Sequence, residues 1–178
     1  MAVPDSTLDL PTSMIAASRA EGRYTGPHGS MKTPVTYTSR IAVEHRATLE
    51  QLLFFNGCQD RFATGIVDAI DKFGPPEIQD DDGWLRVRVA GPSEVQSLFV
   101  VDEATGRPLG VAVYTRADAE HVTVLHIGLA EQYCAGGERE SLKLLLRLMK
   151  EIRRSSKRVK GVRRLSVHYG TQRARLPA

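Results

Sequence analysis

The amino-acid sequence predicts a single α/β domain built on a mixed, twisted sheet with helices on both faces. The main support is residues 122–169, where an apolar strand pattern is followed by a glycine-containing turn, a long amphipathic helix pattern and a second strand pattern. A strand, helix and strand of this length form a right-handed crossover between parallel neighbours. Alternating and helical apolar patterns also occupy residues 35–121, which supply further strands and helices.

Size and composition fit one globular domain. The chain has 178 residues, of which 42% are hydrophobic and 25% are charged, and its formal net charge is +3. No apolar run approaches the roughly 20 residues that cross a bilayer. Residues 1–6 lack the cationic and apolar regions of a secretory signal. We therefore expect a cytoplasmic protein with no membrane partner.

The two cysteines, Cys58 and Cys134, are far apart in the sequence. Neither belongs to a CxxC pair or to the spacing of Cys and His that is typical of a zinc site. This argues against a disulfide framework and against a metal centre. We expect two reduced thiols.

Periodic patterns divide the chain into elements. Residues 1–34 show little periodicity, which favours a flexible N-terminal arm before a domain of residues 35–170 and a tail of residues 171–178. Strands are expected at residues 35–43, 84–89, 98–101, 109–114, 122–129 and 162–169, and an acidic turn is expected at residues 79–83. Helices are expected at residues 46–55, at residues 60–73 with Asp60 as N-cap, and at residues 138–154.

The turn after residue 129 carries the clearest functional signal. It reads Gln132-Tyr-Cys-Ala-Gly-Gly137 and lies between a strand pattern and the expected start of a helix. The first N–H groups of a helix have no partner within the helix, and the helix dipole is positive there, so this arrangement predicts an anion site. We expect a phosphate-bearing cofactor to bind at this turn.

The order of the elements resembles that of the GNAT (Gcn5-related N-acetyltransferase) family. The residues that carry the resemblance are Leu125-His-Ile-Gly-Leu-Ala-Glu-Gln-Tyr133, together with the glycines and the amphipathic helix that follow. It covers residues 35–169 in element order, and its specific part is residues 122–147. The resemblance implies a GNAT-like sheet that binds acetyl-CoA or another acyl-CoA. In the family, the central strand binds the pantetheine, and a Gln/Arg-x-x-Gly-x-Gly/Ala loop binds the pyrophosphate.

Two alignments of that loop are possible. The first places Gln132, Ala135 and Gly137 at the Gln, first Gly and last Gly positions, whereas the second uses Cys134, Gly137 and Arg139 and loses two of the three signature residues. We prefer the first, because small residues let the backbone approach a phosphate. The cofactor-binding residues that the resemblance implies are Ile127, Gly128, Leu129, Gln132, Ala135, Gly136, Gly137, Glu138 and Arg139.

The chain departs from the family after its last strand. The family continues with another helix and two strands that wall the acceptor side, whereas only residues 170–178 follow here. We expect a C-terminally shortened fold that lacks these elements. An exposed edge on the last strand predicts either a homodimer through that strand or cover from the N-terminal arm.

His126 and Tyr169 are the candidate catalytic residues. His126 is expected on the face that it shares with Val124 and Gly128, where it would deprotonate an amine, because imidazole titrates near neutral pH. The alternative for His126 is a core histidine that is bonded to a backbone carbonyl. Tyr169 would protonate the leaving thiolate, and its alternative role is packing at the end of the strand.

Basic residues gather in the last quarter of the chain. Between Arg139 and Arg175, Lys and Arg far outnumber Glu140 and Glu151, the only acids. We expect most of these cations on a solvated helix end, where they complement the helix dipole. Contact with the 3′-phosphate of CoA and nonspecific binding of nucleic acid are the alternatives. Nucleic acid is not favoured as a partner, because no aromatic residues are interleaved with the cations.

The function that these patterns and the resemblance predict is acyl-CoA-dependent N-acyl transfer, most simply acetyl transfer, to a small-molecule or peptide amine. A backbone N–H of the central strand would stabilise the developing oxyanion. The leading alternative is a non-catalytic GNAT-like module that binds CoA or serves in assembly. A basic nucleic-acid-associated protein is the third hypothesis.

Overall fold

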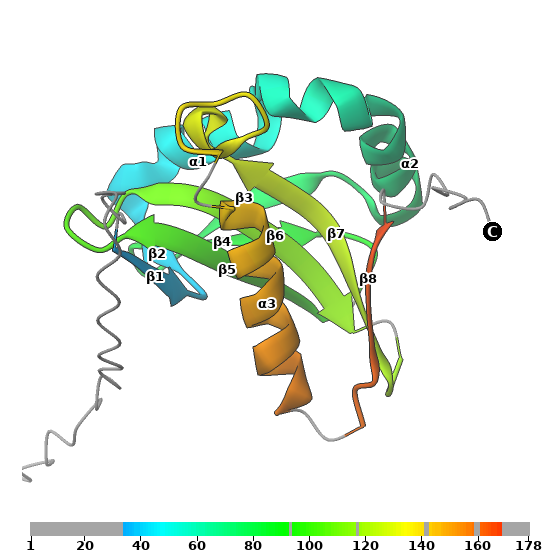
Figure 1. Ribbon diagram of the computed structural model, residues 1–178. Helices are drawn as coiled ribbons and strands as arrows, with labels where there is room; N and C mark the ends of the chain where they lie inside the picture. The colour runs from blue at the N-terminus through cyan, green and yellow to red at the C-terminus, as the bar shows by residue number, and fades with distance from the viewer. Residues whose placement is uncertain (1–33, 93, 117, 141–142, 159–160, 169–178) are drawn as a thin grey trace, which may run out of the picture. The chain divides into compact units, whose positions relative to one another are not determined.

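The computed structural model describes residues 34–168, with the exception of residues 93, 117, 141–142 and 159–160 (Figure 1). The expected arm and tail lie outside the described residues, apart from Pro34. The strands are β1 (Val35–Thr38), β2 (Ile41–Ala42), β3 (Pro76–Asp81), β4 (Trp84–Val89), β5 (Val95–Asp102), β6 (Pro108–Arg116), β7 (His121–Leu129) and β8 (Arg164–Val167). The helices are α1 (Arg46–Phe54), α2 (Ala63–Phe73) and α3 (Leu144–Lys157), with 3-10 helices η1 (Val43–His45), η2 (Gly57–Phe62) and η3 (Glu131–Tyr133).

A five-stranded mixed sheet organises the fold, in the order β1-β5-β6-β7-β8. Its neighbours are antiparallel except for β7 and β8, which run parallel and are connected through α3. The predicted α/β class and the predicted parallel pair are therefore confirmed. In the described part of the chain, β1 and β8 are the two edge strands of this sheet.

A second, three-stranded sheet has the order β2-β4-β3, which the sequence patterns did not predict. The expected strand at residues 84–89 is present as β4, but it pairs with β3 and β2 and does not join the larger sheet. The expected turn at residues 79–83 was too long, because β3 continues to Asp81. Only Asp82 and Gly83 turn the chain, with φ values of 50° and 81°, as in a two-residue hairpin. Backbone pairing here overrides the low strand propensity of an acidic segment.

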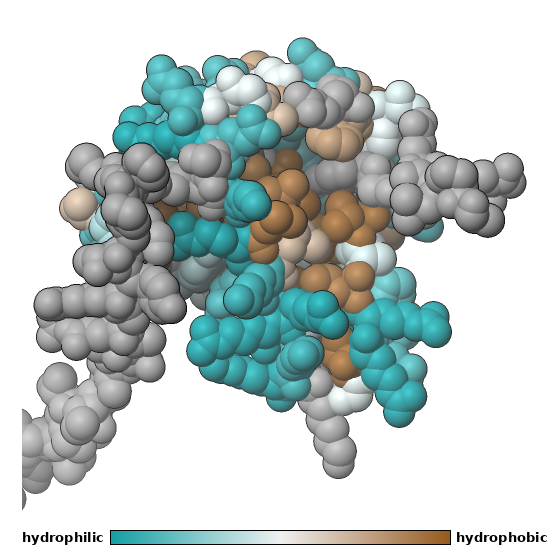
Figure 2. Space-filling model, in the orientation of Figure 1, coloured by the Kyte–Doolittle hydropathy of each residue, from teal (hydrophilic) through white to brown (hydrophobic). Residues whose placement is uncertain are grey.

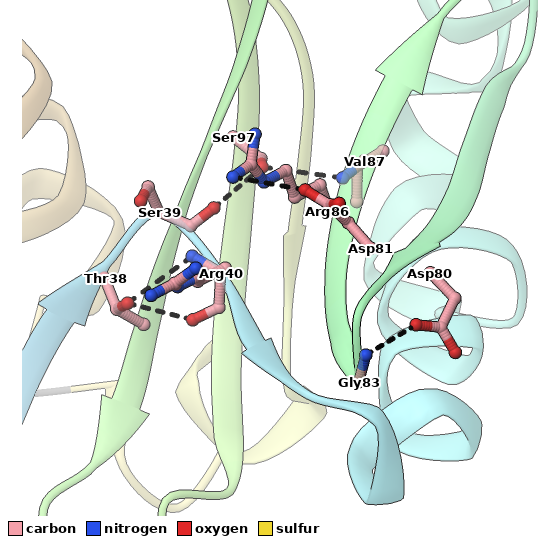
Figure 3. Close-up of polar contacts among 9 residues, drawn as sticks. All are labelled: Thr38, Ser39, Arg40, Asp80, Asp81, Gly83, Arg86, Val87 and Ser97. Atoms are coloured by element: carbon pink, nitrogen blue, oxygen red, sulfur yellow. Dashed lines mark hydrogen bonds and ion pairs between the residues drawn. The ribbon is translucent and has the colours of Figure 1, made fainter. Parts of the chain in front are cut away.

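The two sheets meet beside Ser97 (Figure 3). The hydroxyl of this buried β5 residue donates to the carbonyl of Ser39, at 3.3 Å, and accepts from the N–H of Val87 on β4, at 3.5 Å. The predicted strand over residues 35–43 is divided at Ser39 and Arg40. The first half, β1, pairs with β5, and the second half, β2, pairs with β4.

The core has two parts, one on each face of the five-stranded sheet. On one face, α1 packs Leu49, Leu52 and Leu53 against apolar residues of β4, β5 and β6. On the other face, α3 packs Leu144, Leu148 and Ile152 against β5, β6 and β7. Figure 1 shows α1 and α2 on one side of the sheet and α3 on the other. Helices therefore cover both faces, as predicted.

Two helix starts differ from the prediction. α2 begins at Ala63 with Phe62 at the N-cap position, and not at Asp60, because residues 57–62 form the 3-10 helix η2. The side chain that caps η2 is Asn56, which accepts the N–H of Cys58 at 3.0 Å. α3 begins at Leu144 and not at residue 138, which changes the expected anion site.

The expectation of two reduced thiols is wrong in this structure. Cys58 and Cys134 form a disulfide, with 6.3 Å between their Cα atoms and 76 residues between them in sequence. The fold brings them together because η2 and the turn after η3 both lie at the C-terminal end of β7. Sequence spacing could not reveal this, since a disulfide between distant segments depends on tertiary proximity alone.

Gly128→Ala is expected to lower the free energy of unfolding by at least about 2 kcal/mol. A Cβ on Gly128 would contact the carbonyl oxygen of Leu52 and would lie 2.9 Å from its carbonyl carbon, so β7 and α1 would have to separate. Gly57→Ala is the matched control, because its Cβ would lie no closer than 3.5 Å to the carboxylate of Glu131. Urea denaturation of both variants tests this, and equal midpoints would contradict it.

Candidate functional site

The C-terminal half of β7 is the part of the sheet that positions the candidate site. β7 pairs with β8 only from His121 to Val124, opposite Arg164 to Val167, and continues to Leu129. A bulge at Leu125 interrupts its register with β6, since Val113 is opposite His126 and Tyr114 is opposite Val124. β7 therefore extends beyond its described pairing with β8.

The bulge decides which way His126 points. Val124 packs on the α3 side of the sheet and Leu125 on the α1 side. The ring of His126 also lies on the α1 side, where its Nε2 is 3.2 Å from Nε2 of Gln59. The expected shared face with Val124 is therefore wrong, because a bulge changes the two-residue alternation. Gly128 does lie on the same side as His126, against Leu52.

His126 is a core histidine. It is 5% exposed, and it is hydrogen-bonded to the backbone of Leu53 as well as to Gln59. Burial lowers the pKa of its imidazole from 6.5 to about 4, and the bond to Leu53 only partly opposes this shift. The ring is therefore neutral at pH 7 and enclosed. This geometry matches the structural alternative for His126 better than the role of a base that meets substrate.

Residues 56–59, which we call the strap, fasten the end of β7 at three points. Nδ2 of Asn56 donates to the carbonyl of Leu129. Cys58 is bonded to Cys134 just beyond η3. Nε2 of Gln59 donates to the carbonyl of Ile127, at 3.2 Å. Asn56 is 8% exposed, so its hydrogen bonds are well shielded from water. Sequence patterns missed these residues, although the Asn56-Gly-Cys-Gln59 segment ends a helix pattern and contains a cysteine.

The loop after η3 is folded differently from the expected phosphate cradle. The N–H of Gly136 donates to Oε2 of Glu140 at 2.8 Å, and the N–H of Arg139 donates to the carbonyl of Gln132 at 2.7 Å. The N–H groups of Gly137 and Glu140 are also bonded to carbonyls of the same loop. These donors do not form the start of α3, so the predicted helix start at residue 138 is wrong and these N–H groups are bonded within the loop.

Close packing explains why the loop needs its glycines. A Cβ on Gly137 would lie 2.5 Å from the carbonyl oxygen of Glu131, so this glycine lets the loop fold back onto η3. Gly136 has a φ of 85°, which favours glycine. Lys143, immediately before α3, has a φ of 48° and separates the loop from the helix. The glycines that suggested a phosphate site therefore serve the fold of the loop.

A cavity of about 520 Å³ lies beside η3. Two of the predicted cofactor residues, Gln132 and Arg139, line it. The others predicted in this region, Ala135, Gly136, Gly137 and Glu138, belong to the loop and are not among the lining residues. The remaining lining residues are Thr48, Gln51, Leu52, Phe55, Asn56, Asp102, Thr105, Arg107, Pro108, Leu109, Ala130, Glu131 and Tyr133. The cavity therefore joins the end of α1, the loop between β5 and β6, and the end of β7.

Charged and hydrogen-bonding groups dominate the rim of this cavity. Nη1 of Arg139 donates to the hydroxyl of Tyr133 at 3.1 Å, and its guanidinium lies 5.9 Å from the centre of the same ring. The Tyr133 ring is buried, at 4% exposed, which fixes the position of its hydroxyl. Arg107 is exposed on the opposite loop, next to the turn that the Asp102 carboxylate caps through Ala104 and Thr105. Two guanidinium groups, of Arg107 and Arg139, and two carboxylates, of Asp102 and Glu131, line the cavity, and the guanidinium groups can form paired hydrogen bonds to an anionic ligand.

Apolar surface lies on the α3 side of the same strand end. Figure 2 shows hydrophobic residues between the start of α3 and the sheet, above the hydrophilic surface of α3. Ile127 on β7 and Leu165 and Val167 on β8 are half-buried, and Leu145 and Leu146 at the start of α3 are 40% and 62% exposed. The exposed side of α3 carries the predicted cations, which include Lys150, Arg153, Arg154, Lys157 and Arg158.

The other candidate catalytic residue, Tyr169, lies outside the described residues. Nε2 of His168 lies 2.9 Å from the carboxylate of Asp68 on α2, and its ring contacts Phe73 edge to face. The described residues contain no group of three or more His, Cys, Asp and Glu side chains that could hold a metal ion. Among the same residues, no helix is long and apolar enough to cross a membrane.

Comparison of the chain with family models, with curated proteins and with solved structures found no match in any of the three.

Proposed function

We propose that the protein binds an acyl-CoA at the C-terminal end of β7. The observation that carries the proposal is the strand itself, which continues from Val124 to Leu129 after its described pairing with β8 has ended. The N–H of Ala130 donates to the carbonyl of Leu109 on the β6 side. Because the backbone groups of successive strand residues point alternately to the two sides of the strand within the sheet, those of Ile127 and Leu129 point away from β6, toward the free edge of β7. An extended chain that contains amides, such as pantetheine, is complementary to such an edge.

The surroundings of this strand end match the remaining parts of an acyl-CoA. Arg107 and Arg139 on the cavity rim are suited to phosphates, because guanidinium groups form paired, charge-assisted hydrogen bonds. The apolar surface near Ile127 suits an acyl or pantetheine chain. In this proposal Gln132 and Arg139 keep the cofactor role expected of them, as cavity side chains and not as part of a helix start.

Arg139→Ala is expected to weaken the binding of CoA roughly tenfold, because it removes one charge-assisted hydrogen bond to phosphate. Isothermal titration with CoA and with acetyl-CoA measures the effect. Arg88→Ala is the matched control, since Arg88 is an exposed arginine on β4 and is not among the cavity residues. If the unmodified protein binds neither ligand, or if both variants weaken binding equally, the proposal fails.

A second candidate function is transfer of the bound acyl group to an amine. The observation that favours it is that a carboxylate, Glu131, and a phenol, Tyr133, line the cavity together. In such a reaction the amine nitrogen attacks the thioester carbonyl, its proton passes to Glu131, and the C–S bond breaks as the thiolate takes a proton from Tyr133. Mass spectrometry of acetyl-CoA incubated with protein and a panel of amines tests this. Tight binding of acetyl-CoA without acetylated amine would limit the function to binding.

A further inference from the structure

The strap covers the same edge of β7 that the proposed ligand would use. The carbonyls of Ile127 and Leu129 face away from β6, and in the structure they accept hydrogen bonds from the side-chain amides of Gln59 and Asn56. These two amides take the place that the N–H groups of a neighbouring strand, or of an extended ligand, would occupy. The strap and such a ligand therefore compete for the same acceptors.

The disulfide is the only covalent attachment of the strap to this region among the described residues. It lies between the two amide contacts along the chain, with Asn56 on one side of Cys58 and Gln59 on the other. Cys58 and Cys134 are each half-buried, so a small thiol can reach the bond. Phe55 and Asn56 also line the cavity together with Glu131 and Tyr133. Movement of the strap would therefore open the edge of β7 and widen the cavity at once.

We propose that the Cys58–Cys134 disulfide is a redox latch, which closes the edge of β7 when oxidised and releases it to an amide-containing extended ligand when reduced. The reductant is a dithiol. One of its thiolates attacks one sulfur of the protein, the S–S bond breaks, and the other protein sulfur leaves as a thiolate. The second thiol of the reductant, as its thiolate, then attacks the reductant's own sulfur in the mixed disulfide, so the bond to the protein breaks and the second protein sulfur leaves as a thiolate. The protein gains two thiols, and the reductant becomes a disulfide, so two electrons are transferred.

After reduction, the strap loses its covalent attachment and keeps its hydrogen bonds and the burial of Asn56. A protein–protein hydrogen bond contributes little net free energy, because an open strap exchanges it for bonds to water. Neither Phe54 nor Phe55 anchors the strap firmly, since these side chains are 45% and 78% exposed. Reduction therefore turns a covalently closed edge into one that opens readily. The choice of acyl-CoA as the ligand rests on the proposed function, whereas the latch itself does not.

Hydrogen–deuterium exchange of the full chain with and without dithiothreitol tests the latch. We expect exchange in residues 56–59 and 127–134 to rise roughly tenfold or more on reduction, and in the reduced protein to be faster than exchange in β5 and β6, whose amides report unfolding of the whole domain. Unchanged exchange in the strap would overturn the latch. Exchange in residues 56–59 and 127–134 of the reduced protein that is no faster than exchange in β5 and β6 would also overturn it, because the strap would then open only when the whole domain unfolds.

Titration with CoA under both conditions tests the ligand. The reduced protein is expected to bind CoA roughly tenfold more tightly than the oxidised protein. Equal affinity in the two states would overturn the gating of this ligand. If CoA binds in neither state while the strap still responds, the proposed function fails and the latch stands.

Two variants make the test independent of the reductant. Cys58→Ser/Cys134→Ser is expected to show the exchange pattern of the reduced protein and no response to dithiothreitol. Gln59→Leu removes one amide and leaves the disulfide intact, so its exchange should rise further on reduction than that of the unmodified protein. If the serine variant does not fold, the titration of the unmodified protein with reductant decides the proposal.

Discussion

Cys58→Ala/Cys134→Ala is expected to lower the free energy of unfolding by about 4 kcal/mol. The disulfide joins residues that are 76 positions apart, so it closes a long loop and removes much of the freedom of the unfolded chain. With an ordinary dependence on urea, this loss corresponds to a midpoint lower by roughly 2 M. The remaining stability comes from the two parts of the core, and the substitution changes only the edge of the part on the α3 side, against which Cys134 packs.

Urea denaturation followed by circular dichroism, with and without dithiothreitol, measures this effect. The unmodified protein should lose the same free energy on reduction, whereas the double alanine variant should not respond to reductant. Identical midpoints of the unmodified protein in both conditions would show that the disulfide contributes nothing to stability. The hydrogen–deuterium exchange experiment then shows which segments open after reduction, whereas the urea midpoint reports only the stability of the whole fold.

The shifted pKa of His126 is expected to lower the free energy of unfolding of the unmodified protein by about 3 kcal/mol as the pH falls from 6.5 to about 4. Burial lowers the pKa of the folded imidazole to about 4, whereas the unfolded chain has the ordinary value of 6.5. Between these values the unfolded state binds a proton that the folded state does not, so acid favours unfolding. The contribution is absent above pH 6.5, where the imidazole is neutral in both states.

His126→Gln isolates the contribution of His126 to the pH dependence of stability, because glutamine can still form hydrogen bonds but does not titrate. Chemical denaturation at pH 7 and at pH 4 gives the loss for each protein. The variant should be less stable than the unmodified protein at pH 7, because its side chain fits the site less well, and it should lose about 3 kcal/mol less on acidification. Equal losses in the two proteins would show that His126 does not titrate as its burial requires.

The result for His126 would also constrain the function. An imidazole that stays neutral to about pH 4 and is buried is a structural group. Proton transfer in an acyl-transfer reaction would then fall to the cavity residues Glu131 and Tyr133. The pH dependence of stability and that of any activity would accordingly have different origins, and separate measurements would distinguish them.

The larger elements could be predicted because their signals are local. α1, β4, β6 and β7 lie within a few residues of their predicted bounds, since apolar residues repeat at the period of each element. β3 was missed because its residues are acidic and exposed, so only pairing with β4 makes it a strand. The start of α3 was misplaced because the loop after η3 has helical composition near residue 138 but folds back onto η3 at Gly137 and Arg139.

Prediction of the site was less complete, because the site depends on contacts between distant residues. Gln132 and Arg139 were identified from a loop pattern, and they do line the cavity. Asn56 and Gln59 were missed because their role depends on carbonyls about 70 positions away, at Leu129 and Ile127. The bulge at Leu125, which turns His126 toward α1, has no signature in a single apolar strand pattern.

The sequence by itself determined the α/β class, the parallel β7–α3–β8 crossover and the cationic last quarter of the chain, because each follows from local periodicity and charge. Only the tertiary structure decided which contacts the strand, glycine turn and helix around residue 132 make. It bonds the loop N–H groups within the loop, buries His126, and joins Cys58 to Cys134 across the end of β7. The physical reason is that hydrogen-bond satisfaction, burial and disulfide geometry are set by neighbours in space, which sequence order does not specify.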